Sequence, residues 1–423
     1  MSTQQKYKLL TNNTKKEVND GPILYQIEAI RDFGIVKEGE LGGWIEKESN
    51  LSHDGDCWVF EKASVYGNAQ IFGHAKVSGN AQIFGSACVF GNSWVYGSAF
   101  VYGSASVYGK ACIFDNANVY DNAQIFDNAN VCGNAVVCGN AKVYDIATIM
   151  YNAKVFGAAC VHGRAHVSEN ARVFETANVY GNAKITNEAW VHGNAKVYGN
   201  AKVSENANIN GGAEIYGDAS IQGKTRICDN ASVYDNAVIS ENAFIFGNAE
   251  VYGNALVCEH AEISENACIY GNSQISGNAS ICGDAKVFGK ASILGTVCID
   301  GNTQISGSMV INGTSVLNDD NSSNNGKDSN WNTYSMDKFL YSDNLLTTSL
   351  SILETKYPPG QFYIKSTKSN KSVYFFIYKK ISTNTDILND SASDILYWEY
   401  KPGLTSIALV PEAKEITVRL YNG

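Results

Sequence analysis

The chain has few prolines, few histidines and no excess of positive charge. Its 423 residues include 5 prolines and 6 histidines, and 32 Lys and Arg stand against 42 Asp and Glu, which gives a net charge of −10. A chain with this balance lacks the basic footprint that nucleic acids and anionic membranes require. No stretch approaches the ~18 continuous apolar residues of a membrane-spanning helix. We therefore expect neither nucleic acid nor membrane as a partner.

Paired cysteines are also missing. The 11 cysteines are scattered along the chain without any CxxC motif, and this pattern favours free thiols in a reducing compartment over disulfides or a metal centre. The first residues, MSTQQKYKLLTNN, contain no apolar segment like that of a secretory signal. We therefore expect a cytoplasmic protein without a bound metal.

A six-residue repeat dominates the sequence, as in VFGNSWVYGSAFVYGSASVYGKA at 89–111. A Val or Ile stands at every sixth position from Val59 to Ile311, and an Ala follows nearly all of them four residues later, from Ala63 to Ala291. The position two after the Val or Ile is nearly always Gly, Asp, Glu or Asn. Self-similarity at a fixed period predicts a solenoid.

The chemistry of each position predicts the local structure. Side chains alternate between the two faces of a strand, so the Val/Ile and the Ala before it point one way, and the residues on either side of the Val/Ile point the other way. The Val/Ile and Ala positions carry no charge, so they form the core. Gly and Asn tolerate left-handed backbone conformations and supply the turns. We expect a strand of about four residues, then a turn, repeated.

The residue directly after each Val or Ile shows how many strands make one coil. At every third hexad this position is aromatic, interrupted only by His162; the residues are Phe72, Phe90, Tyr108, Phe126, Tyr144, Tyr180, Tyr198, Tyr216, Tyr234, Tyr252, Tyr270 and Phe288. The second such column is mixed, and the third is mostly small and polar, as at Ser168, Thr186 and Ser204. Three columns predict a triangular coil of three hexads, and roughly 14 coils in all.

These features resemble the hexapeptide-repeat left-handed parallel β-helix over residues 59 to about 316. The leader at 31–63 resembles that of a narrower group of bacterial and phage proteins often labelled acyltransferases on fold alone, through Gly42-Gly43-Trp44 and Gly55-Asp56-Cys57-Trp58. The resemblance implies a left-handed coil, a trimer, and an acetyl-CoA or other acyl-CoA substrate handled by a general-base His at the trimer interface.

The domain organisation follows from the limits of the repeat. We expect an N-terminal cap at 1–58 with strands at 23–30 and 42–45, a β-helix at 59–317, a polar linker at 318–330, and a small β-rich module at 331–423. Within the module, the pattern predicts one helix over 345–356, a hairpin over 362–380, and strands over 395–400 and 415–422. The expected fold class is all-β.

Three histidines are the weak candidates for catalysis. His162 and His192 follow a Val, and His166 precedes one, so all three lie at outward positions, where an imidazole is most often merely solvated. The repeat also contains no loop insertion that could close a substrate site. We therefore expect a non-enzymatic protein without catalytic residues or a cofactor, with an acyl-CoA-dependent acyltransferase as the alternative.

The aromatic column is the strongest functional candidate. It is either an interface or a set of rings that stack on one another, and an exposed strip of this length favours a buried contact. We predict a homo-oligomer, a trimer by resemblance, with a protein or carbohydrate as a further possible partner. The resemblance also suggests a phage or prophage origin, for which the virion is the alternative location to the cytoplasm. An ice-binding face is not expected, because His166, Lys184 and Lys202 flank the Ser/Thr column.

Overall fold

The computed structural model describes residues 4–18, 21–317 and five strands beyond them: Leu350–Ser351, Tyr363–Lys368, Lys371–Ile377, Glu399–Tyr400 and Val418–Asn422. The chain divides into two compact units, 1–223 and 224–423, which are treated separately below. Their boundary falls inside the repeat, so the predicted domain limits stay a prediction. Within the described ranges, the structure contains no helix with the length and hydropathy needed to cross a membrane.

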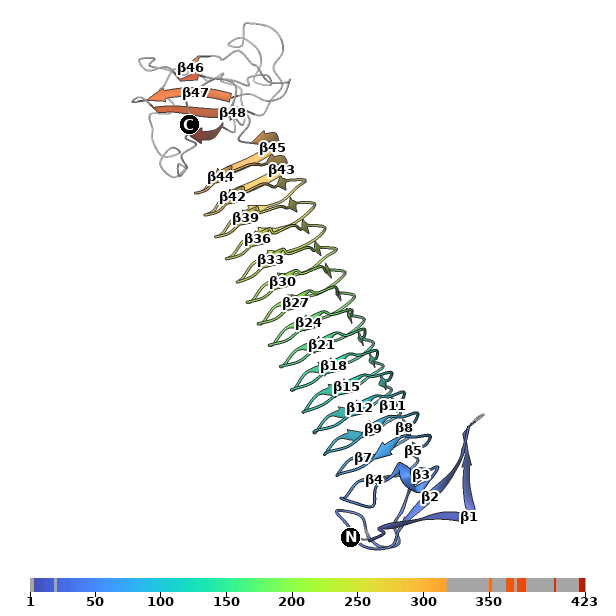
Figure 1. Ribbon diagram of the computed structural model, residues 1–423. Helices are drawn as coiled ribbons and strands as arrows, with labels where there is room; N and C mark the ends of the chain where they lie inside the picture. Colours follow the sequence, from blue (N-terminus) through green and yellow to red (C-terminus); the bar gives the residue numbers. More distant parts are fainter. Residues whose placement is uncertain are drawn as a thin grey trace. The chain divides into compact units, whose positions relative to one another are not determined.

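The first unit begins with three strands that lack the hexad. Strand β1 (Tyr7–Glu17) pairs antiparallel with β2 (Ile23–Ala29), and β2 pairs antiparallel with β3 (Leu41–Ile45). A short 3₁₀ segment, Glu48–Asn50, follows. Strand β3 then pairs in parallel with β5 (Ser64–Val65), which belongs to the repeat (Figure 1). The two apolar runs of the leader are therefore strands, and β3 joins them to the repeat.

From β4 (Trp58–Val59) to β42 (Lys286–Val287), a two-residue strand begins every six residues. Within each unit, a strand pairs in parallel with the third strand along the chain, as β10 (Trp94–Val95) does with β13 (Cys112–Ile113). The partners Trp94 and Cys112 are 18 residues apart, which is the predicted coil. The all-β class and the parallel β-solenoid are confirmed.

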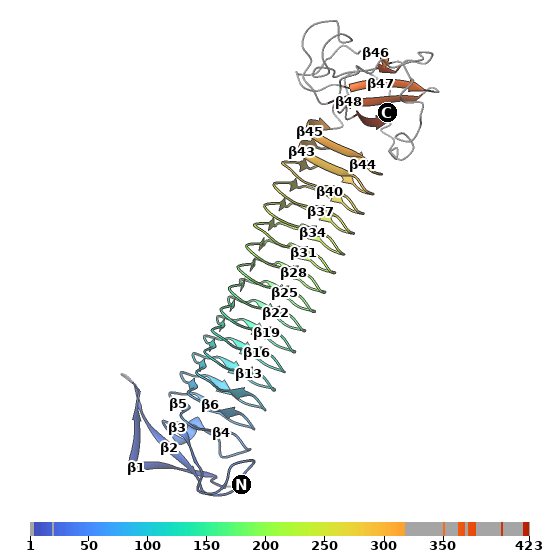
Figure 2. The ribbon, with the colours of Figure 1, turned by 180° about the vertical axis from the view of Figure 1, so that it is seen from behind.

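Three rows of strands line the coils of the first unit. We call the row from β6 (Gln70–Ile71) to β30 (Glu214–Ile215) the aromatic face, because the aromatic column follows its strands. The mixed face runs from β5 to β29 (Asn208–Ile209), and the polar face runs from β4 to β31 (Ser220–Ile221). Every third strand belongs to the same face, as Figures 1 and 2 show.

The strands are shorter than the expected four residues because the turns take more of the hexad. The backbone N–H of Ala69 donates to the carbonyl of Tyr66 at 3.4 Å, so the turn closes over four residues and leaves two for the strand. The residue after Tyr66, Gly67, has a φ of 67°, and Asp115 and Tyr151 have a φ of 58° at the same position of their hexads. This left-handed conformation explains why glycine and short polar residues dominate that position.

The core consists of the Val/Ile and Ala positions, as predicted. Val179 and Ala177 have no exposed surface, and the same is true of nearly every other residue in these two positions. Ser93 stands in an Ala position, and its hydroxyl donates to the carbonyl of Phe90 at 2.7 Å. A buried hydroxyl with a partner costs little, so the exception does not interrupt the core.

The second unit continues the hexads and ends in a separate sheet. Strands β43 (Ser292–Ile299) and β45 (Val310–Leu317) pair in parallel over their full length. A five-stranded sheet follows in the order β46 (Leu350–Ser351), β49 (Glu399–Tyr400), β47 (Tyr363–Lys368), β48 (Lys371–Ile377) and β50 (Val418–Asn422). The antiparallel pair β47–β48 confirms the predicted hairpin.

The helix predicted over 345–356 is wrong where the structure describes that segment. Leu350 and Ser351 form strand β46, which pairs antiparallel with β49. The helical spacing of leucines there is outweighed by the Ser and Thr residues of LLTTSLS, which are weaker helix formers than Leu. The linker predicted at 318–330 lies outside the described residues.

Candidate functional site

The aromatic column forms a continuous ladder of stacked rings along the aromatic face of the first unit. We call it the aromatic ladder; in this unit it comprises Phe72, Phe90, Tyr108, Phe126, Tyr144, His162, Tyr180, Tyr198 and Tyr216. Successive centroids are 4.6 to 5.0 Å apart, and the ring planes are within 7° of parallel. In the second unit, Tyr234, Tyr252, Tyr270 and Phe288 stack in the same way.

Stacking limits how much of each ring in the aromatic ladder is exposed to a partner. Phe72 at the start is 36% exposed, and every later ring of the ladder is only partly exposed. Each ring covers a face of its neighbour, so edges and tyrosine hydroxyls are left to the solvent. Burial raises the pKa of Tyr108 and Tyr144, and their phenols stay protonated at neutral pH. The ladder is therefore a narrow strip of ring edges rather than a row of open rings.

The mixed face carries shorter ladders. Tyr66, Phe84, Tyr102 and Tyr120 stack in order with centroids 4.8 to 5.0 Å apart. After a gap, Phe174 stacks on His192 at 4.6 Å and meets Trp190 edge to face at 6.1 Å. The Arg172 guanidinium lies 5.0 Å from the Trp190 ring.

The three catalytic candidates lie on three different faces. His162 follows a strand of the aromatic face, His192 follows one of the mixed face, and His166 belongs to β22 (His166–Val167) of the polar face. His162 stacks between Tyr144 and Tyr180, as a member of the aromatic ladder. The structure thus gives each imidazole its own surroundings and does not assemble the three into a site.

Two of these histidines have carboxylate neighbours. Nδ1 of His162 lies 3.5 Å from Asp145 Oδ2, and Nδ1 of His192 lies 3.7 Å from Glu175 Oε2. A carboxylate can orient a general-base imidazole. Both carboxylates, however, also accept a backbone N–H from the next coil, that of Gly163 at 2.9 Å and that of Gly193 at 2.7 Å. The main role of these two carboxylates is therefore to stabilise the turns. They lie near the histidines because the 18-residue repeat places the two positions side by side.

The other turn carboxylates have the same role. Oδ2 of Asp115 accepts the N–H of Gly133 at 3.1 Å, and Oε2 of Glu205 accepts the N–H of Gly223 at 2.9 Å. Asparagines at the next position form ladders, as when the Asn116 amide donates to Asn134 Oδ1 at 3.1 Å. Among the described residues, no group of three or more His, Cys, Asp and Glu side chains is arranged to hold a metal ion. The recurring acids are explained by hydrogen bonding between coils.

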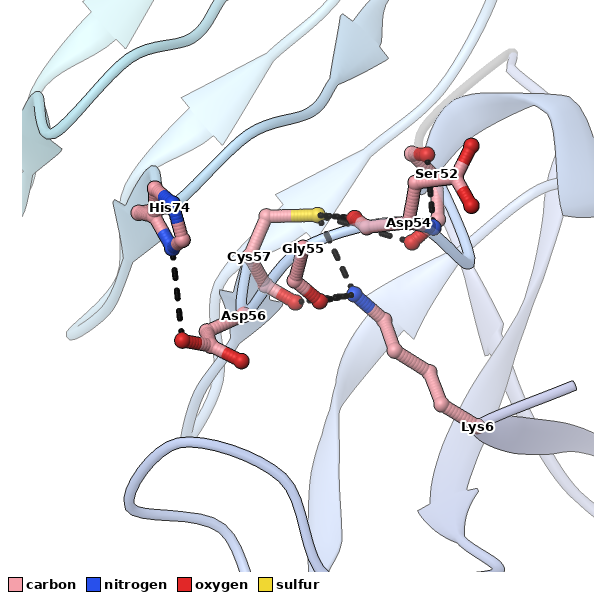
Figure 3. Close-up of polar contacts among 7 residues, drawn as sticks. All are labelled: Lys6, Ser52, Asp54, Gly55, Asp56, Cys57 and His74. Carbon is pink, nitrogen blue, oxygen red and sulfur yellow. Dashed lines mark hydrogen bonds and ion pairs between the residues drawn. The ribbon is translucent and has the colours of Figure 1, made fainter. Parts of the chain in front are cut away.

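The N-terminal cap contains a polar cluster that sequence reasoning missed (Figure 3). In the repeat, strand N–H groups donate to carbonyls of the following coil, as Trp58 does to Ala75 at 3.1 Å. The carbonyls of the first coil consequently need donors from elsewhere. Nζ of Lys6 donates to the carbonyls of Gly55 at 3.0 Å and Cys57 at 2.9 Å, and the Asn50 amide donates to the carbonyl of Ala69 at 2.9 Å. The cap replaces the missing coil partly with these side chains and partly with its own backbone, as when the N–H of Trp44 donates to the carbonyl of Ala63 at 2.9 Å.

The same cluster holds a thiol next to the ammonium. Lys6 and Cys57 are fully buried, and Nζ of Lys6 lies 3.3 Å from Sγ of Cys57. Burial lowers the pKa of Lys6 and raises the pKa of the Cys57 thiol. A buried thiol with a raised pKa is a poor nucleophile. Nothing in the sequence pattern could have identified Lys6, because it lies outside the repeat and its partners are about fifty residues away.

Comparison with known proteins gives one short similarity. A stretch of 62 residues, 15% of the chain, is 37% identical to part of the uncharacterized acetyltransferase YdcK of Escherichia coli strain K12. The matched stretch spans only 18% of that protein's length. No family model matches the chain.

Proposed function

We propose that this β-solenoid protein is a non-enzymatic scaffold that associates with further copies of itself, three in all, through the aromatic face. The observation that carries the proposal is the aromatic ladder. Its rings stack within 7° of parallel along the whole aromatic face of the first unit. A straight strip of ring edges is self-complementary, because a second copy presents an identical strip at the same spacing.

Several features near the ladder favour association over simple exposure. Tyr198 has its hydroxyl 3.2 Å from Glu214, which also binds Lys196 at 2.9 Å. Interfaces of this type combine aromatic residues at the centre with paired charges at the rim. The ring edges would be withdrawn from water on every subunit at once in a cyclic trimer. The scattered cysteines favour the cytoplasm as the setting for such a scaffold, and the leader resemblance suggests a phage particle instead.

The oligomeric state tests this proposal directly. Light scattering after size exclusion should give about three times the 45.7 kDa chain mass. Replacing Tyr180, Tyr198 and Tyr216 together by Lys should dissociate the assembly, because three cations on each strip repel one another. The fold should survive, since all three positions are partly exposed.

A matched control uses the mixed face. Changing Phe84, Tyr102 and Tyr120 together to Lys removes three stacked rings of the same kind from another face. This variant should keep the wild-type mass. A wild-type mass equal to one chain, or dissociation of both variants alike, contradicts self-association through the aromatic face.

The alternative is an acyltransferase, and the similarity to the E. coli protein named as an acetyltransferase favours it. Calorimetric titration of the full chain with acetyl-CoA separates the two functions. We expect no saturable binding, because His162, His166 and His192 lie on different faces. Micromolar binding that is lost in His162→Ala or His166→Ala would establish the enzyme instead.

A further inference from the structure

A column of basic residues, one histidine and two lysines, runs along the polar face of the first unit. His166 of β22 pairs directly with Lys184 of β25 (Lys184–Ile185), and Lys184 pairs with Lys202 of β28 (Lys202–Val203). These strands follow one another along that face (Figure 2). Adjacent strands are about 4.8 Å apart, so the three side chains start from neighbouring rungs. Both lysines are exposed, and His166 is partly exposed.

This arrangement is unfavourable for the free protein. Like charges directly opposite one another on neighbouring strands destabilise a sheet. On the aromatic face the same geometry is satisfied by opposite charges, since Lys196 pairs with Glu214 and their side chains bond at 2.9 Å. In the part of the chain that the structure describes, neither Lys184 nor Lys202 forms an ion pair. An anionic group placed between the two lysines would offset this repulsion.

The charge of Lys184 affects the neighbouring histidine of the column. Burial, and after it the charge of Lys184, lowers the pKa of His166. The charge is also local, because the chain as a whole carries −10. Two lysines without an acidic partner among the described residues therefore stand together on a protein whose net charge is negative.

Hydroxyl groups border the cations. Ser168, Thr186 and Ser204 follow the same three strands, on the same outward side. Ser168 is 4% exposed and Ser204 is partly exposed. Thr148 pairs with His166 at one end of the column, and Ser220 pairs with Lys202 at the other. A column of hydroxyl-bearing residues therefore runs beside the basic column, with Thr186 and Ser204 partly exposed and Ser168 buried.

We propose that this surface, formed by His166, Lys184 and Lys202 with the adjoining hydroxyls, binds an acidic polysaccharide that lies along the polar face. A chain of uronic acids carries carboxylates separated by neutral hydroxyls, and both groups find partners here. A denser polyanion such as a nucleic acid is disfavoured, because the net negative charge of the protein repels it at long range. This site is independent of self-association, which uses the aromatic face.

Calorimetric titration of the full-length protein with a short oligogalacturonate tests the proposal. We expect saturable binding that falls by about tenfold or more when Lys184 and Lys202 are both changed to Gln, since two charge-assisted contacts are lost. The matched control changes Lys76 and Lys110 to Gln. It removes the same charge from the polar face and from an exposed turn, where neither lysine lies opposite another cation on a paired strand, and it should leave the affinity unchanged. Light scattering should show the wild-type mass for both variants, so a failure here is separable from a failure of self-association.

Three results would overturn the proposal. The first is the absence of saturable binding to the oligogalacturonate. The second is equal weakening by the control variant, which would indicate long-range attraction without a site. The third is tighter binding of inorganic tripolyphosphate, or undiminished binding of the carboxyl-reduced oligosaccharide, since either would assign the surface to another ligand chemistry.

Discussion

Val179→Asp is expected to melt the coils around it. Val179 has no exposed surface, and it pairs with Val161 on one side and Val197 on the other. A carboxylate placed there has no hydrogen-bond partner, so we expect the free energy of unfolding to fall by about 4 kcal/mol. The loss should spread, because each coil is stabilised only by its neighbours. Thermal denaturation followed by circular dichroism measures the loss, and hydrogen exchange maps its extent.

Tyr180→Ser is the control one residue away. Tyr180 is partly exposed and stacks on His162 at 5.0 Å and on Tyr198 at 4.8 Å. Losing two stacking contacts should cost about 1–2 kcal/mol, well below the effect of Val179→Asp. Equal decreases in melting temperature would show that the inward and outward positions have been assigned wrongly.

Lys6→Ala should open the N-terminal cap. The variant leaves the carbonyl of Gly55 and the buried carbonyl of Cys57 without their ammonium donor, and it also removes the contact of Nζ over the Phe33 ring at 5.0 Å. We expect a loss of about 2–3 kcal/mol, concentrated in the cap. Because Cys57 is fully buried in the wild type, its alkylation rate, measured peptide by peptide with mass spectrometry, should rise.

Lys8→Ala is the matched comparison for the cap. Lys8 lies in β1, two residues after Lys6, and its side chain is 53% exposed in an ion pair with Glu28 at 3.0 Å. An exposed pair contributes at most about 1 kcal/mol, so Cys57 should stay protected. If Cys57 reacts equally slowly in the Lys6 variant, the ammonium is not what closes the cap.

The period alone predicted the coil, its three faces and the buried positions. The prediction succeeded because each environment recurs every 18 residues. The assignment of Val179 to the core is therefore supported by the same residue type at its strand partners Val161 and Val197. The length of the strands was missed, since it depends on the hydrogen bond that closes each turn, such as Ala69 to Tyr66. Lys6 was missed for a different reason. Its contacts join distant parts of the chain once, and only three-dimensional packing reveals them.

The sequence predicted where the candidate site lies, but not how its rings and charges are arranged. The aromatic column was visible in the sequence, but its self-stacking was one of two open readings, and only the ring geometry shows that Tyr180 and Tyr198 cover each other. The basic column was visible as well, at His166, Lys184 and Lys202. Only the strand register shows that these residues lie directly opposite one another without acidic partners on the paired strands.

Because each strand in the first unit pairs with the third one along, the position of a residue within its 18-residue coil decides on which face it lies. Removing 18 residues from this repeat would delete one rung from each column and leave every other residue on its own face. Removing six residues would instead shift all later residues by one face, so Tyr180 would stand on the mixed face while Tyr144 stayed on the aromatic face. The ladder would break at that point although the core remained filled. Changes in length that preserve the surfaces of this protein must therefore come in whole coils.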